Sequence, residues 1–522
     1  MFPVAGSTIQ DVVCCYAPES LATSRSAKTK RLSKPLKMHL AVFILLVFAL
    51  LFFPTPTLHR RYPPGPRPLP INGNLHQILR RDPWRKIKEW HQEFGPLVTV
   101  CFGLRPIVFL GSHRCVTNLL QRRGSIHSSR PAYFAQGLGS ELLTVGLPYG
   151  PRLRLHRRLV HSFLNRGECE RYVTLQDIES KQLLHELLST THFGRVFHRF
   201  SASLTFALAY GQRLEKGTED EIVEIDQIMR ELLDNLWLPS VAFPLLDYIP
   251  PCFAPWKRAS EALSKRQANF FLRNFERALH RSKSNWSKHL RQQETTNKPD
   301  LTEMAYIIGT LYEAGSDTTA FVLHVFVLAC VLHPSTVHQA QHELDSVLGL
   351  QIPELQDFPR LSYVNAFVQE VLRWRPVVPG GIQRATARDD VYQGYEIPRG
   401  TVLVPNHWSL EFDEEVFYDP WAFKPERWIE KPDLPCSAFG FGRRKCPGQN
   451  LARNSLKLVI SRMLWAFDFD ARKMGGSLPD AFKMTQGISS RPEDFEFEFC
   501  TRSERHGDAI RDAYREIVST CR

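Results

Sequence analysis

A cysteine in a glycine-rich, cationic loop is the strongest candidate for chemistry in the sequence. Residues 439–448 read Phe-Gly-Phe-Gly-Arg-Arg-Lys-Cys-Pro-Gly, with the cysteine at 446. Cations and free backbone N–H groups both stabilise a thiolate over a thiol, so Cys446 is the best ligand candidate among the 11 cysteines. The alternative is a buried, inert thiol, which requires the glycines, cations and cysteine to coincide by accident.

A second candidate lies inside a long apolar segment, where residues 314–319 read Ala-Gly-Ser-Asp-Thr-Thr. A glycine within a helix costs about 1 kcal/mol relative to alanine, so Gly315 indicates that something approaches the backbone closely. A neighbouring helix would explain it without chemistry. Asp317 and Thr318 add an acid and a hydroxyl within one turn, which suggests proton handling.

The third feature is an acid and a base three residues apart on a predicted helix, Glu370 and Arg373. The apolar stripe of this helix, which includes Phe367 and Val371, leaves both charges on the other face. Taken alone, the spacing therefore favours a solvated ion pair of little energetic value.

The elements that must position these residues are mostly helical. Asp300 and Glu303 form a capping pair that opens an apolar segment ending at His333-Pro334, so we expect one long helix there. The segments 98–110 and 391–404 are rich in β-forming residues interrupted by turn residues, and each predicts a hairpin. The sequence thus predicts a mainly α fold with a smaller β-rich region.

These features together resemble the cytochrome P-450 family of haem-thiolate monooxygenases. The spacing Phe439-x-x-Gly442-x-Arg444-x-Cys446-x-Gly448 is similar to the family's haem-binding loop. The family also carries Ala/Gly-Gly-x-Asp/Glu-Thr in a long central helix, and Glu-x-x-Arg followed further along by an arginine, here Arg427. The resemblance covers roughly residues 62–500, and it is strongest to fungal microsomal members of specialised metabolism.

The resemblance implies a haem b cofactor with Cys446 as the axial ligand of the iron, whose electron donation favours O–O cleavage. The other residues it assigns to cofactor binding are Arg444, Arg157, Arg384 and Phe439. It assigns proton relay to Thr318 and Asp317. It makes Glu370, Arg373 and Arg427 a structural ion-pair network near the loop, which reverses the interpretation of a solvated pair.

Two positions depart from the family's pattern. Where related chains have a tryptophan that bonds a haem propionate, four residues before Arg157, this chain has Leu153. Where they often have histidine, it has Gln383, although Arg384 follows. We therefore hypothesise looser haem retention.

The resemblance also implies the reaction and the partners. One oxygen atom from O2 would enter a lipophilic small molecule, with electrons from NADPH through NADPH-cytochrome reductase and with cytochrome b5 as a second donor. A cationic face would steer the acidic reductase, and it comprises Arg152, Arg154, Arg157, Arg158, Arg443 and Lys445. The alternatives are an electron-independent haem-thiolate isomerase or dehydratase, and a non-catalytic haem sensor. We see no nucleic-acid-binding motif.

Composition and the N-terminal region set the organisation of the chain. With 522 residues, 43% hydrophobic and 23% charged, it is neither collagen-like nor disordered, and its net charge of +12 favours acidic partners or membranes. We predict an extension at 1–37, which initiation at Met38 would omit. A membrane anchor follows at 38–58, and then a proline-rich hinge at 59–81. We place the catalytic domain at 82–500 and a charged tail with an amphipathic helix at 501–522. This predicts a single-pass endoplasmic reticulum protein facing the cytosol.

Overall fold

Helices make up most of the computed structural model, which describes residues 62–520 except 80, 138–139, 215–218, 236–241, 244–245, 247, 295–297 and 470–477. The α-helices are α3 (Pro83–Phe94), α4 (His113–Val116), α5 (Ala132–Gly137), α6 (Pro151–Leu164), α7 (Arg166–Arg171), α8 (Val173–Leu187), α9 (Phe193–Tyr210), α10 (Glu219–Asn235), α12 (Pro255–His280), α13 (Trp286–Gln292), α14 (Leu301–Leu332), α15 (Pro334–Val347), α16 (Ser362–Trp374), α17 (His407–Glu411), α18 (Arg427–Glu430), α19 (Gln449–Ala466) and α20 (Glu504–Thr520). Shorter helical turns are η1 (Thr117–Arg122), η3 (Pro251–Phe253), η4 (Leu355–Arg360) and η5 (Gly442–Arg444).

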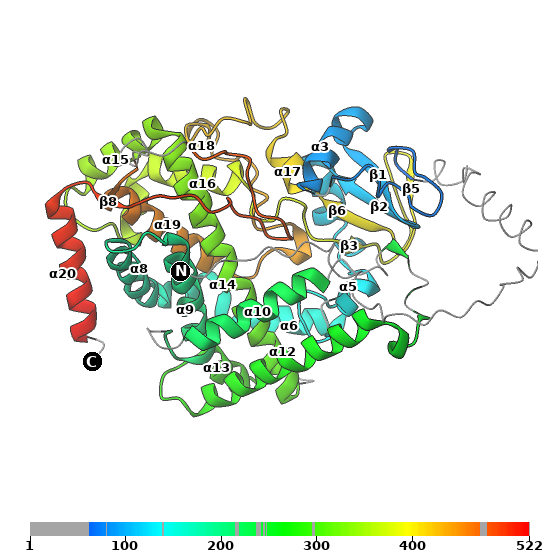
Figure 1. The fold of residues 1–522 in the computed structure, drawn as a ribbon, viewed down its shortest axis with the longest axis horizontal. Helices are drawn as coiled ribbons and strands as arrows, with labels where there is room; N and C mark the ends of the chain where they lie inside the picture. Colours follow the sequence, from blue (N-terminus) through cyan, green and yellow to red (C-terminus); the bar gives the residue numbers. More distant parts are fainter. Residues whose placement is uncertain are drawn as a thin grey trace, which may run out of the picture. The chain divides into compact units, whose positions relative to one another are not determined.

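Most strands gather at one side of the helices, next to α3, whereas β8 lies at the opposite side near α15 and α20 (Figure 1). The strands are β1 (Leu97–Phe102), β2 (Arg105–Leu110), β3 (Arg384–Ala385), β4 (Asp390–Tyr392), β5 (Tyr395–Ile397), β6 (Val402–Pro405), β7 (Phe467–Asp468) and β8 (Cys500–Thr501). The larger sheet has the order β1-β2-β6-β3, whereas β4 pairs with β5, and β7 with β8.

The first predicted hairpin is confirmed, since β1 and β2 pair antiparallel around a turn at Gly103. The second is only half right. Gln393 and Gly394, both with positive φ, turn β4 tightly onto β5, while β6 lies parallel to β2 in the other sheet. Segment 391–404 therefore divides between two sheets.

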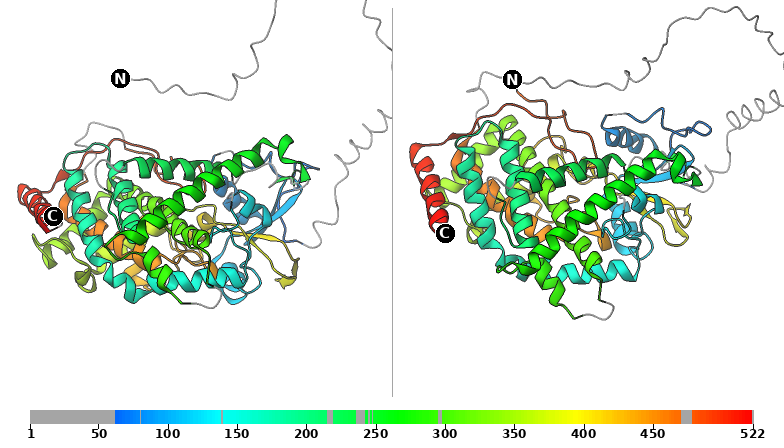
Figure 2. Two further views of the ribbon diagram at one scale, coloured as in Figure 1. Left: turned by 90° about the horizontal axis from the view of Figure 1, so that it is seen from below. Right: turned by 60° about the horizontal axis from the view of Figure 1, so that its bottom comes forward.

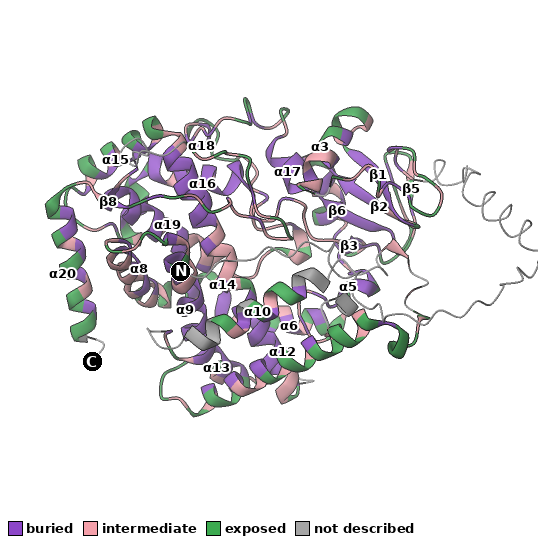
Figure 3. Ribbon diagram, viewed as in Figure 1, coloured by how far each residue is buried: buried purple, intermediate pink, exposed green. Residues whose placement is uncertain are grey.

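The predicted long helix is α14, which crosses the helical part of the structure (Figure 2). Asp300 caps it, because its side chain accepts a hydrogen bond of 2.7 Å from the Glu303 N–H. A Cβ added at Gly315 would lie 2.5 Å from Thr205 Cγ2 on α9, so close helix packing explains this glycine. Most of α14 is buried, together with the inner faces of α16 and α19 (Figure 3).

The end of the chain forms α20, as the apolar spacing predicted. Ile510 and Ile517 are buried, and the Tyr514 ring stacks on His185 of α8 with centroids 3.9 Å apart. The tail helix is therefore packed onto the catalytic body.

One helix among the described residues, Leu301–Leu332, is long and apolar enough to cross a membrane. It is α14, whose most apolar window is mostly buried within the protein, so it is a core helix. The predicted extension at 1–37 and anchor at 38–58 lie outside the described residues.

Candidate functional site

The loop that carries Cys446 adopts a conformation that only its glycines allow. Gly440 and Gly442 have φ values of 68° and 52°. A Cβ at Gly442 would lie 2.0 Å from the carbonyl oxygen of Leu120, so the loop packs directly on the backbone of η1. The Cys446 N–H donates to the Phe439 carbonyl at 2.8 Å, which closes the loop.

The thiol of Cys446 is influenced by fewer cations than the sequence suggested. Burial raises its pKa, and the Gly448 N–H and the Arg157 guanidinium oppose this rise. Arg443 is exposed and lies over the Tyr149 ring at 4.9 Å, so it does not supply the stabilisation expected from the loop's cations. A bound metal ion strongly favours the thiolate over the thiol. The Cys446 sulfur, whose thiolate receives little help from cations, is therefore suited to binding a metal ion.

Three arginines lie around this loop without an acidic partner among the described residues, of which Arg130 and Arg384 are buried and Arg444 is partly exposed. Arg444 Nε donates to the Ser128 carbonyl at 2.8 Å, and Arg384 Nη2 to the Phe441 carbonyl at 2.8 Å. Arg130 Nε donates to the Val145 carbonyl at 2.8 Å.

The pKa values of two of these guanidinium groups, those of Arg130 and Arg444, show the same lack of counter-charge. Burial lowers the pKa of Arg130, and Arg444 and Arg384 lower it further. Burial, followed by Arg384 and Arg157, lowers the pKa of Arg444 to about 9. No carboxylate opposes either shift.

One donor in the cluster is buried without a partner among the described residues, namely Arg384 Nη1. Buried cations and an unsatisfied donor together call for anions at this place. Haem carries two propionate carboxylates beside its iron, so Cys446 and the arginines fit this cofactor. Arg157, whose charge acts on Cys446, lies on the sulfur's side of the cluster.

Arg130 is a residue that the sequence reasoning missed. Its Nη1 donates to the Gln383 carbonyl, and the Tyr133 hydroxyl donates to the Gln383 side chain. Residue 383 therefore holds an additional arginine through its backbone carbonyl, while the Gln383 side chain, at the position that departs from the family's pattern, contacts Tyr133. Leu153 is buried in α6 and provides no polar group.

Asp317 and Thr318 lie in the middle of α14 but do not bond each other. Thr318 Oγ1 donates to the Ala314 carbonyl of its own helix at 2.9 Å. Asp317 Oδ1 lies 2.9 Å from Nε2 of His198 on α9. His198 was not singled out from the sequence, since a single histidine on the partly exposed side of a helix carries no signal of its own.

Glu370, Arg373 and Arg427 come together in the interior, so the interpretation of a solvated pair is wrong. The side chains of Glu370 and Arg373 both have 0% exposure, and Glu370 Oε1 lies 2.7 Å from Arg373 Nη2. Arg427 Nε lies 3.2 Å from Glu370 Oε1. Arg373 also donates to the Glu411 carbonyl, and the Glu411 side chain accepts from the Ser437 N–H at 3.0 Å. The network thus reaches the segment that enters the Cys446 loop.

Most of the cationic residues expected to meet a partner lie at the surface near the same loop, but Arg157 is only partly exposed and its charge acts on Cys446. Arg154 and Arg443 both lie over the Tyr149 ring, at 5.8 and 4.9 Å, which joins the start of α6 to the tip of the loop. Arg158 and Lys445 are exposed as well. Arg152 is partly neutralised by Glu303 at 2.6 Å.

The chain is similar to known proteins along most of its length. The sequence profile of cytochrome P450 matches residues 63–499. The cytochrome P-450 monooxygenase aneD of Aspergillus aculeatus is 42% identical, covering 87% of this chain and 91% of the relative. The monooxygenase FrzL of a Cladobotryum species is 39% identical, covering 90% and 93%. Fumitremorgin C synthase of Aspergillus fumigatus is 35% identical, covering 87% and 91%. This chain therefore belongs to the cytochrome P-450 family of monooxygenases, whose members use haem as cofactor.

Proposed function

We propose that this enzyme inserts one oxygen atom from O2 into a lipophilic small molecule, as an oxidative step in the biosynthesis of a secondary metabolite. The observation that carries the proposal is the cluster of buried arginines without counter-ions around the Cys446 loop. It matches a cofactor that combines a metal ion with carboxylates. Relatives such as fumitremorgin C synthase support the product class.

Haem b, when bound, supplies the activation of dioxygen. Cys446 would provide the sulfur that binds its iron, and the Gly448 N–H and Arg157 favour negative charge on that sulfur. Arg130, Arg384 and Arg444 would hold the propionates by charge-assisted hydrogen bonds. Phe439 closes the loop through its carbonyl oxygen.

Protons reach the reaction through α14. Asp317 and Thr318 provide a carboxylate and a hydroxyl in a segment that is otherwise apolar, and such groups hold and pass protons where bulk water is excluded. His198 orients the Asp317 carboxylate from α9.

Electrons come from NADPH through NADPH-cytochrome reductase, with cytochrome b5 as a second donor. The exposed cations Arg154, Arg158, Arg443 and Lys445 favour association with an acidic protein near the Cys446 loop.

The protein is held at the endoplasmic reticulum membrane by the segment 38–58, with its catalytic domain in the cytosol. A group of exposed apolar side chains supports contact of that domain with a lipid surface: Leu69, Ile71, Leu104, Tyr248 and Phe253. Two distant segments meet there, because the Leu104 N–H donates to the Ala242 carbonyl at 3.1 Å.

The carbon monoxide difference spectrum of the reduced, membrane-bound protein tests the proposal, beside that of Cys446→Ser. We expect a thiolate-type Soret band that the variant lacks, and NADPH consumption that requires the reductase. A band without turnover on any lipophilic substrate would instead support the isomerase, dehydratase or sensor alternatives. Absence of a band would refute the haem site.

A further inference from the structure

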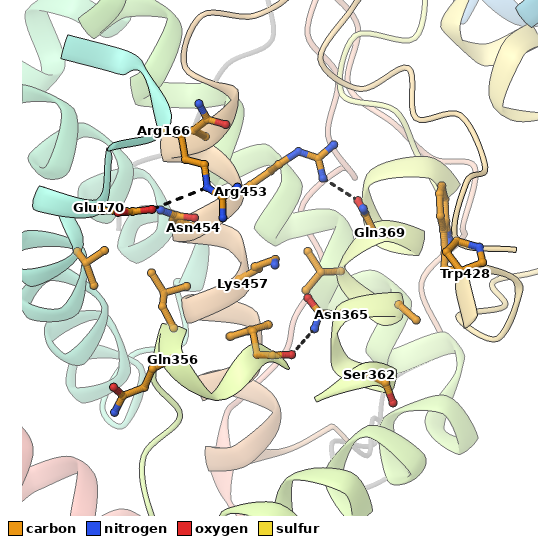
Figure 4. Close-up of a pocket in the computed structure, with 17 residues that line it drawn as sticks. Arg166, Glu170, Gln356, Ser362, Asn365, Gln369, Trp428, Arg453, Asn454 and Lys457 are labelled. Atoms are coloured by element: carbon orange, nitrogen blue, oxygen red, sulfur yellow. Dashed lines mark hydrogen bonds and ion pairs between the residues drawn. The ribbon is translucent and has the colours of Figure 1, made fainter. Parts of the chain in front are cut away.

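A cavity of about 700 Å³ lies between α7, α16, α19 and the turn η4. Figure 4 shows Arg166 and Glu170 at one side, Gln369 and Asn365 at the other, and Lys457 between them. Neither Cys446 nor any arginine of the candidate haem site lines this cavity. It is therefore a separate site.

Two cations in the cavity lack an acidic partner. Burial lowers the pKa of Lys457, Arg453 lowers it further, and no carboxylate opposes the shift. Arg453 Nη1 donates to Gln369 Oε1 at 3.1 Å, a neutral acceptor. Of the described residues that line the cavity, Glu170 alone is acidic, and it lies at an exposed position 3.8 Å from Arg166.

This charge arrangement costs free energy unless something compensates it. Arg453 and Lys457 are four residues apart on α19, where like charges repel, and both are only partly exposed. Each lies over an aromatic ring, Lys457 over Phe358 at 5.1 Å and Arg453 over Phe439 at 4.7 Å. The rings therefore restrict where the two charges can lie.

Further donors face the same space. The amide side chains of Asn450 and Asn454 line the cavity and make no hydrogen bond to the rest of the described chain. Phosphate oxygens accept hydrogen bonds from both amides and cations. A volume of about 700 Å³ exceeds the need of a single phosphate and lies within the usual range for ligand pockets.

We propose that this cavity binds a small polyanion of the phosphate class, such as a nucleoside triphosphate or inorganic pyrophosphate. Lys457 and Arg453 supply the counter-charge, and Asn450 and Asn454 donate to the remaining oxygens. The proposal does not rest on the enzyme's reaction, because binding can be measured without turnover. Since Arg453 packs on Phe439, whose carbonyl accepts from the Cys446 N–H, occupancy also affects the haem loop.

Calorimetric titration of the full-length, haem-loaded protein with pyrophosphate and with ATP at low ionic strength tests this. The variants are Lys457→Gln and, as a charge-matched control, Lys431→Gln, which is exposed and does not line the cavity. Loss of one charged hydrogen bond should weaken binding by roughly tenfold or more in Lys457→Gln, and leave the control unchanged. Equal affinities in the two variants would refute the proposal.

A second variant, Gln369→Glu, keeps the test decisive if Lys457→Gln folds poorly. It places a carboxylate beside Arg453 and so imitates the bound anion. We expect Gln369→Glu to raise the thermal unfolding temperature of the protein without added anion and to abolish pyrophosphate binding. If wild type binds neither pyrophosphate nor ATP, while Lys457→Gln weakens only the association with the reductase, the cavity receives acidic side chains of a protein and the proposal is wrong.

Discussion

The arginine cluster makes a sharp prediction for Arg130, which the family motifs do not include. We consider Arg130→Gln, a change that removes the charge and keeps an amide donor. In the haem-free protein two opposing effects meet. The variant loses hydrogen bonds to the carbonyls of Val145 and Gln383, and it relieves repulsion from Arg384 and Arg444.

In the haem-loaded protein the balance changes, because the propionates remove the repulsion and add a charged contact. A hydrogen bond to a charged group is worth about 1.5–3 kcal/mol, which corresponds to roughly ten- to hundredfold faster loss of haem. The variant should therefore destabilise the haem-loaded protein more than the haem-free protein by about this amount.

Haem dissociation rates and thermal unfolding of both forms measure this difference. Arg388→Gln is the control, because Arg388 is exposed and has no partner among the described residues. If Arg130→Gln destabilises the haem-free and haem-loaded forms equally, the role of Arg130 is structural only and the argument from uncompensated charge fails. If the predicted result holds, Arg130 supplies a contact to haem that offsets part of the one missing at Leu153.

Two further predictions concern buried carboxylates. Glu370→Gln should lower the free energy of unfolding by about 3–5 kcal/mol, because it leaves the Arg373 guanidinium buried without its counter-ion. Denaturant titration would show this, and an effect no larger than that of the exposed control Glu430→Gln would contradict it. Burial raises the pKa of Glu313 from 4.5 to about 8, so the folded protein binds the proton more tightly than the unfolded chain. The free energy of unfolding of wild type relative to Glu313→Gln is then highest below pH 4.5 and falls by up to about 1.4 kcal/mol per pH unit until about pH 8. Denaturant unfolding of both proteins over this pH range measures the difference, and a constant difference would contradict the raised pKa.

Local sequence signals predicted the elements well. The capping pair at Asp300, the glycines at 440 and 442 and the apolar spacing of the tail helix each describe contacts made within a few residues. The helical period of the apolar residues predicted a solvent-exposed position for Glu370, which is wrong for a physical reason. One apolar stripe predicts one buried face, but α16 packs on α14, α15, α18 and α19 together, so its polar face is enclosed as well.

Residues missed by the sequence reasoning act through partners far away in the chain. Arg130 meets Arg444, and His198 meets Asp317, across more than a hundred residues. No local period records such pairs, and an arginine or histidine between ordinary neighbours is expected at the surface. The same limit affected Arg443, because the sequence predicted both that it stabilises the Cys446 thiolate and that it belongs to the cationic face, and only the structure shows that its side chain lies over Tyr149.

The candidate haem site and the cavity beside Lys457 share one feature of their charges. At both sites basic side chains stand at least partly out of water, without an acidic partner among the described residues. Burial and neighbouring arginines lower the pKa of Arg130, and burial and Arg453 lower the pKa of Lys457. Around Cys446 a cofactor with two carboxylates would account for this apparent cost. A structure that tolerates the same cost at Lys457 and Arg453 gains from it only if an anion binds there too. Because the two cations are four residues apart on α19, their like charges could have been read from the sequence, but only the enclosing cavity distinguishes them from a solvated helix face.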